Sequence, residues 1–330
     1  MVKMTQRGIR PPLALSSAVV YLAAVVLLQP LHAAISANDL LAAGNVDEAI
    51  QILQQRVGRA TNDAESDNLL CRAYFMIADW DRGISFCERA TKLDPQKSLY
   101  HLWLGRIYGE KADRAGFLSA AGLAKKVRSS FERAVDLDPK SWEARIDLAE
   151  FYLEAPSMVG GGQDKARAQG DALLRISPAM AHWVFARIAG RNKERTEAER
   201  EYRAAIEVSH GTAQNWLHLA QFLAHADRAH EAEDAVRKIE SSEIDRADAL
   251  MDGASLLLRI GGDSALAVRL LRRYLKSPSE EGPAFKAHDF LGQLLEKQGD
   301  RRAAAEEYRA ALALSHTFTR AQEDLKRVGP

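Results

Sequence analysis

Three histidines that lie close together in the chain are the first candidates for metal binding or acid–base chemistry: His218, His225 and His230. Metal ligands carried by one helix usually stand three or four residues apart, whereas the spacings here are seven and five. His230-Glu231 also lacks the second histidine of a His-Glu-x-x-His zinc site. We therefore predict ordinary histidines and no metal site.

Other catalytic patterns are missing as well. The sequence contains no nucleophile elbow and no dinucleotide-binding glycine fingerprint. Gly160-Gly161-Gly162 could leave backbone N–H groups free for an anion, but no Lys-Ser/Thr follows in phosphate-loop spacing. A flexible connector is the favoured interpretation. We predict no cofactor and no enzymatic activity, and keep an enzyme with an unrecognised site as the last alternative.

The chain has two cysteines, Cys71 and Cys87. They fall in the two helices of an expected antiparallel pair that turns near Trp80, roughly opposite each other. In an oxidising compartment an even number of cysteines favours a disulfide. The alternative is a pair of buried thiols that act as small core residues.

The N-terminus resembles a targeting segment. Residues 1–12 are basic, residues 13–28 are apolar and uncharged, and small residues follow Pro30. This order is typical of a secretory signal peptide over residues 1–33, with residues 34–330 as the mature chain. An uncleaved inner-membrane anchor is the alternative, although 16 residues are short for a bilayer. The segment predicts a periplasmic or otherwise exported protein.

The elements that position these residues repeat every 34 residues. Cys71 and Gly105 are 34 apart, and so are Ala186 and Ala220. Each period contains two amphipathic segments, and β-branched residues never alternate as a strand requires. Units of this kind bury their apolar faces only by stacking on neighbours. The sequence predicts an all-α solenoid.

The pattern resembles the tetratricopeptide-repeat family, with small residues at Cys71, Gly83 and Ala90 and with Pro95 closing the unit. The resemblance implies a right-handed superhelix of about eight helix-turn-helix repeats. Residues 318–328 are expected to form a C-terminal capping helix that keeps the solenoid soluble.

Two repeats depart from the period. The third carries about ten extra residues near 111–127, which predicts a lengthened second helix that either docks a partner or covers a neighbouring groove. The fourth replaces its tight turn with the glycine-rich loop 155–162. The sequence assigns no biochemical role to either feature.

The family resemblance also implies a concave groove lined by the first helix of each repeat. Arginines beside exposed tryptophans could then hold an extended peptide; alternatively, the tryptophans pack between repeats and the arginines form ion pairs. The lysine-and-asparagine arrangement that grips a C-terminal carboxylate in some relatives is missing. The expected groove residues are Asn68, Arg72, Trp103, Arg106, Glu150, Trp183, Arg187, His218 and Gln221.

Charge narrows the choice of partner. The chain has 45 basic and 45 acidic residues, so it lacks the basic excess of a nucleic-acid binder. We expect a protein or peptide partner, with a membrane tether through residues 13–28 if the leader is retained. The favoured function is an exported scaffold, and the alternative is a holdase-like assembly factor for exported polypeptides.

Overall fold

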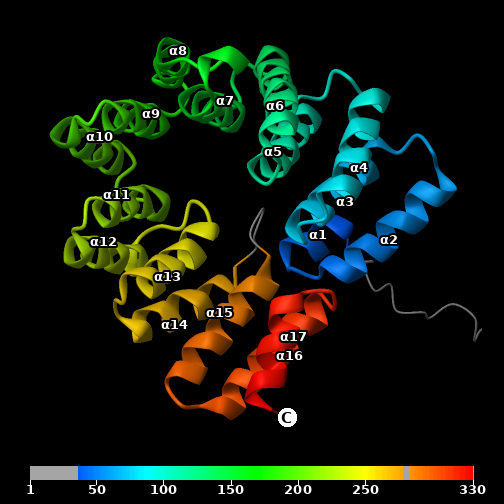
Figure 1. Cartoon of the computed structure of the whole chain (residues 1–330), viewed down its shortest axis with the longest axis vertical. Coiled ribbons are helices and arrows are strands. Elements are labelled where there is room, and N and C mark those ends of the chain that lie inside the picture. Colours follow the sequence, from blue (N-terminus) through cyan, green and yellow to red (C-terminus); the bar gives the residue numbers. More distant parts are fainter. Residues whose placement is uncertain (1–35, 278–282, 330) are drawn as a thin grey trace, which may run out of the picture. The chain divides into compact units, whose positions relative to one another are not determined.

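The computed structural model describes residues 36–277 and 283–329. The leader expected at residues 1–33, including the apolar run 13–28, lies outside the described residues. Within them the fold is entirely helical, which confirms the predicted class (Figure 1). No helix in these ranges combines the length and the hydropathy that a bilayer crossing requires.

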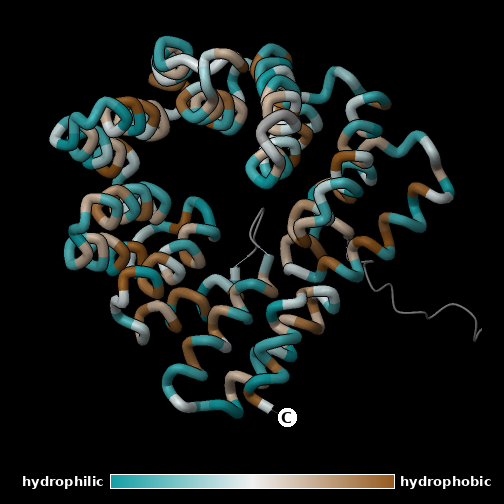
Figure 2. Tube along the Cα trace, viewed as in Figure 1, coloured by the Kyte–Doolittle hydropathy of each residue, from teal (hydrophilic) through white to brown (hydrophobic). Residues whose placement is uncertain are grey.

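In the described residues, 17 α-helices form eight antiparallel pairs followed by a single last helix. Their bounds are α1 Ala37–Ala42, α2 Val46–Arg59, α3 Ala64–Met76, α4 Trp80–Leu93, α5 Ser98–Asp113, α6 Phe117–Leu137, α7 Trp142–Glu154, α8 Gln163–Leu173, α9 Pro178–Arg191, α10 Arg195–Val208, α11 Ala213–His225, α12 Ala229–Ser241, α13 Asp248–Ile260, α14 Ser264–Tyr274, α15 Ala284–Lys297, α16 Arg301–Leu314 and α17 Thr319–Val328. Apolar and polar stretches alternate along the helices, as amphipathic packing requires (Figure 2).

A single left-handed residue turns the chain between the helices of most pairs. Ala78, Lys193 and Asp227 have φ angles of 60°, 64° and 61°, and Gly44 and Gly261 take the same conformation. In each turn the next N–H closes a bond to a carbonyl five residues back, such as Asp79 N to Tyr74 O at 2.9 Å. This is a Schellman ending, which satisfies carbonyls that the helix end would leave unpaired.

Small residues allow the two helices of a pair to approach closely. A Cβ atom placed on Gly105 of α5 would overlap the ring of Phe131 on α6. The two helices of this third pair therefore pack closely against each other. The periodic small positions are therefore packing positions, as the sequence pattern indicated.

The two irregular repeats contact each other. Helix α6 has 21 residues, and the loop after α7 contains a short 3₁₀ helix, Ser157–Val159. Arg128 of α6 donates a hydrogen bond from Nη1 to the carbonyl of Val159 at 3.2 Å. Lys126 lies 4.7 Å from the centre of the Tyr108 ring. Both basic side chains thus pack on neighbouring elements, Arg128 on the loop after α7 and Lys126 on α5.

The last helix pair contacts the first, so the row of pairs closes on itself (Figure 1). Helix α2 packs on α16, and one apolar cluster contains Leu40 of α1 together with Phe285 of α15. Asp47 Oδ2 accepts hydrogen bonds from the backbone N of His316 at 2.7 Å and pairs with its ring Nδ1 at 2.6 Å. Nothing in the repeat pattern pointed to this closure.

Candidate functional site

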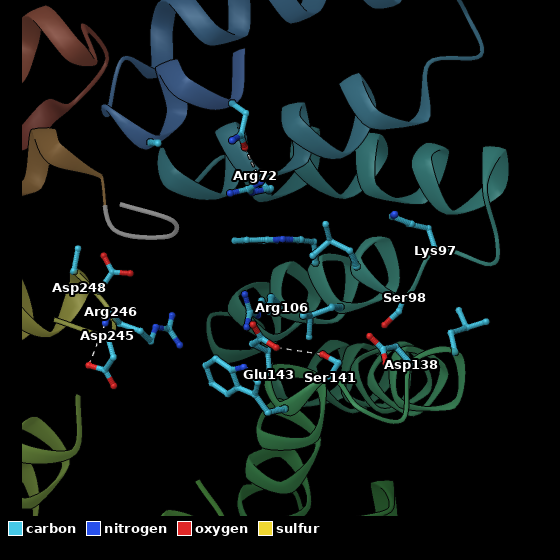
Figure 3. A pocket seen from close by; sticks show the side chains of 18 of the residues that line it. Arg72, Lys97, Ser98, Arg106, Asp138, Ser141, Glu143, Asp245, Arg246 and Asp248 are labelled. Carbon is cyan, nitrogen blue, oxygen red and sulfur yellow. Dashed lines mark hydrogen bonds between the residues drawn. The ribbon is translucent and has the colours of Figure 1, made fainter. Parts of the chain in front are cut away.

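A cavity of about 1260 Å³, here called the central cavity, lies against the first helices of several pairs. Arg72 of α3, Arg106 of α5 and Glu143 of α7 line one side. Asp245, Arg246 and Asp248, from the segment that leads into α13, face them (Figure 3). The cavity is therefore bounded by residues that are more than 100 positions apart in the sequence.

Trp103 organises the arginine side of the central cavity. Its indole is only 3% exposed and packs edge-on against Phe75, with ring centres 5.5 Å apart. The guanidinium carbons of Arg72 and Arg106 lie 5.1 and 5.0 Å from the Trp103 ring centre. Cation–π contacts of this kind fix both arginines against a rigid surface.

Both arginines also have polar partners. Arg72 donates from Nη1 to Asn38 Oδ1 at 3.3 Å, and Arg106 donates from Nε to Asp147 Oδ2 at 2.6 Å. The Arg106–Asp147 pair is largely shielded from solvent, so it is screened less than a surface pair. A partner that reaches Arg106 would therefore have to share or replace an existing carboxylate contact.

A similar arrangement recurs on α9. Trp183 is 7% exposed, and the Arg187 guanidinium lies 5.2 Å from its ring centre. Arg187 donates to Glu150 Oε1 at 3.1 Å and to Glu154 Oε1 at 2.8 Å. Trp103 and Trp183 are thus both buried. Arg106 and Arg187 are both ion-paired. This is the second of the two arrangements that the sequence left open.

The expected groove residues do not form one site. Arg72, Trp103 and Arg106 line the central cavity, whereas Trp183 and His218 line a second, smaller cavity. Asn68 is buried in α3, and its Nδ2 has no hydrogen-bond partner among the described residues. Glu150, Arg187 and Gln221 line neither of these two cavities.

The segment that carries Asp245 and Arg246 was missed by sequence reasoning. It joins the sixth and seventh pairs, where the repeat spacing becomes irregular. That irregularity was the only available signal, and it gave no hint that the segment would face α3 and α5 across a cavity.

The two cysteines form a disulfide between α3 and α4. Their Cα atoms are 5.2 Å apart, and both residues are fully buried. The bond ties together the second helix pair, and Cys71 directly precedes Arg72, the α3 residue that lines the central cavity. In the described residues no group of three His, Cys, Asp or Glu side chains is placed to hold a metal ion.

Comparison with known proteins agrees with this architecture. Residues 40–107 and 285–316 match profiles described as tetratricopeptide repeat. No curated protein sequence matches the chain. Yeast Tom70 is similar in structure, with a TM-score of 0.52 and 16% identity over 86% of this chain and 58% of that chain.

Two further solved structures are less similar. The Cut9–Hcn1 hetero-tetramer of the APC/C gives a TM-score of 0.39 at 12% identity, over 89% of this chain and 54% of that one. A thermophilic repeat protein of Thermus thermophilus gives 0.44 at 21% identity, over 59% and 99%. The chain thus spans little more than half the length of Tom70 and of the APC/C subunit. The chain thus contains tetratricopeptide repeats over residues 40–107 and 285–316, and its other helix pairs have the same antiparallel arrangement.

Proposed function

We propose that this protein is an exported scaffold that holds a segment of a partner polypeptide in the central cavity. Tetratricopeptide repeats typically mediate protein–protein interactions and are usually not enzymes. The observation that carries the proposal is the cavity itself, whose helical walls come mainly from α1, α3, α5 and α7. Its volume is large enough for several residues of an extended chain.

The charges around the central cavity favour a polypeptide of mixed character. The lining contains four cationic and five anionic side chains, so neither sign dominates. The charged lining residues are Arg72, Lys97, Arg106, Arg246, Asp39, Asp138, Glu143, Asp245 and Asp248. A balanced lining can pair with main-chain amides and with side chains of both signs, whereas a polyanion would meet as much repulsion as attraction.

Affinity capture from an envelope fraction tests the scaffold role. We expect the full chain to recover a defined partner, and Arg106→Ala to lower that recovery several-fold. Arg200→Ala is the matched control, because Arg200 is exposed on α10, away from the cavity lining, and pairs with Glu197 and Glu201. Equal recovery of the partner by wild type and by Arg106→Ala would count against the central cavity as the binding site. Weak capture of many unfolded polypeptides would instead favour the assembly-factor alternative.

Export is supported by the order of residues in the leader and by the pairing of Cys71 with Cys87. Disulfides persist in oxidising compartments and are rare in the cytosol. Cell fractionation combined with maleimide labelling under denaturing conditions tests this part of the proposal. We expect the protein in the periplasmic or membrane fraction with both thiols protected from the reagent. Recovery in the cytosol with two labelled thiols would contradict export.

A further inference from the structure

A second cavity, of about 400 Å³, lies where the N-terminal ends of α7, α9 and α11 come together. Most of its wall surface is apolar, and we call it the apolar cavity. The apolar lining residues include Trp142, Ile146, Ile176, Met180, Trp183 and Val208. The volume falls within the range of about 300–1,000 Å³ found for small ligand sites.

The walls combine fixed aromatic surface with an accessible rim. Trp183 is held between neighbours, since the ring of His218 lies 5.4 Å away and Arg187 stacks at 5.2 Å. Val208, at the rim, is 45% exposed and is one of the few large apolar side chains left open to solvent in the described chain. An apolar group that enters the cavity would remove this surface from water.

The α11 wall carries two buried polar atoms with unmet hydrogen-bonding capacity. Asn215 is 1% exposed; its Nδ2 donates to Thr212 Oγ1 at 2.9 Å, but its Oδ1 has no partner among the described residues. His218 Nδ1 is also unpaired there, while Nε2 lies 2.8 Å from the Gln214 amide nitrogen. Buried polar groups are rarely left in this state without a ligand or a water.

The charge state of this wall favours a neutral ligand. Burial, together with the positive charges of Arg187 and Arg246, lowers the pKa of His218 to about 3, so its ring is neutral at physiological pH. The acid at the rim, Asp245, already accepts bonds through Oδ1 from the backbone N–H groups of Gln214 and Arg246, both at 3.1 Å. The site therefore offers aromatic contact and hydrogen bonds, and its charged lining residues are one acid and one base, Asp245 and Arg246.

The apolar cavity adjoins the central cavity, because Trp142, Asp245 and Arg246 line both. The larger cavity is polar enough to accommodate a main chain, and the smaller one accepts a single bulky group. We propose that the apolar cavity binds one large apolar side chain, such as tryptophan, phenylalanine or leucine, of a polypeptide that continues into the central cavity. This inference rests on the proposed function and specifies the sequence of the partner.

A random 12-residue peptide-display library, selected on the purified full chain, tests the inference. We expect the selected peptides to share one large apolar residue. A synthetic copy in which that residue is alanine should bind at least tenfold more weakly, since burial of a large side chain contributes more than one factor of ten. Ala179→Trp should abolish the difference, because Ala179 lines the apolar cavity and an indole there would occupy it.

Matched controls separate cavity filling from damage to the fold. Ala168→Trp adds the same side chain at an exposed position on α8 and should keep the tenfold preference. Val208→Asp, at the exposed rim, replaces Ala179→Trp if the latter fails to fold as judged by circular dichroism, and should also abolish the preference.

Three outcomes would overturn the inference. If the peptides that bind wild type share no large apolar residue, the role proposed for the apolar cavity is wrong, while the scaffold proposal is unaffected. N-acetyltryptophanamide that binds as tightly as the best peptide would show a small-molecule site instead. Failure of every peptide to bind would contradict this inference and count against the scaffold proposal as well, which the envelope capture then tests separately.

Discussion

Loss of the Cys71–Cys87 disulfide should loosen one helix pair more than the rest of the protein. The bond closes a loop with a sequence separation of 16 residues. The chain-entropy treatment gives about 3 kcal/mol for a loop of this size, because the cross-link restricts the unfolded segment. Since 1.4 kcal/mol is a factor of ten, opening of α3 and α4 should become roughly 100-fold more frequent without the bond.

Hydrogen–deuterium exchange followed by mass spectrometry measures this effect locally. Three samples are needed: the oxidised protein, the protein reduced during unfolding and refolding, and the Cys71→Ala/Cys87→Ala variant. The reduced sample keeps both sulfur atoms but lacks the bond, so its difference in exchange from the oxidised protein reports the cross-link. Its difference from the double variant reports the packing of the two sulfur atoms. Exchange should accelerate in α3 and α4, while α10 to α12 serve as the internal control. Unchanged exchange in α3 and α4 of the reduced protein would refute the reasoning.

Three further substitutions test the energetics of burial and packing. Asp289 is 1% exposed, and its burial raises the pKa of its carboxyl group to about 6 from an unfolded value of 3.8. Because the folded protein therefore holds this proton more tightly than the unfolded chain, the free energy of unfolding falls by about 3 kcal/mol as pH rises from 4 through 6. D289N should remove this loss, so its free energy of unfolding in urea should match that of wild type at pH 4 and exceed it at pH 8. The same dependence of stability on pH in both proteins would contradict the assignment. Gly105→Ala should lower stability by about 1–2 kcal/mol, because the new methyl group overlaps the Phe131 ring. Gly122→Ala, with open space around it, should raise stability by up to about 1 kcal/mol, and thermal melts of the two variants provide the comparison.

The repeat pattern was enough to predict the class, the pairing and the number of helices. It succeeds because packing between the paired helices depends on side-chain size at fixed spacing, as the contact of Gly105 with Phe131 shows. The turns between paired helices could not be predicted as well from the sequence. Ala78, Lys193 and Asp227 adopt the left-handed conformation that glycine takes at Gly44, so no common residue type marks the position.

The site was harder to predict than the fold. Whether Trp103 and Trp183 are exposed depends on how far neighbouring first helices stand apart, which periodicity does not specify. Likewise, the position of Asp245 and Arg246 opposite Arg106 results from curvature accumulated over several repeats. Small rotations per repeat determine such long-range contacts, and a single sequence carries no direct record of them.

Contact between α2 and α16 changes how stability is shared among the repeats. In an open array the terminal units have one neighbour and fray first, and cooperativity decays toward the ends. Here the first and the last of the eight pairs each gain a second neighbour, so both ends are held more firmly than in an open array. The contact between α2 and α16 is nevertheless smaller than the other contacts between neighbouring pairs, so we expect the ring of pairs to open there first.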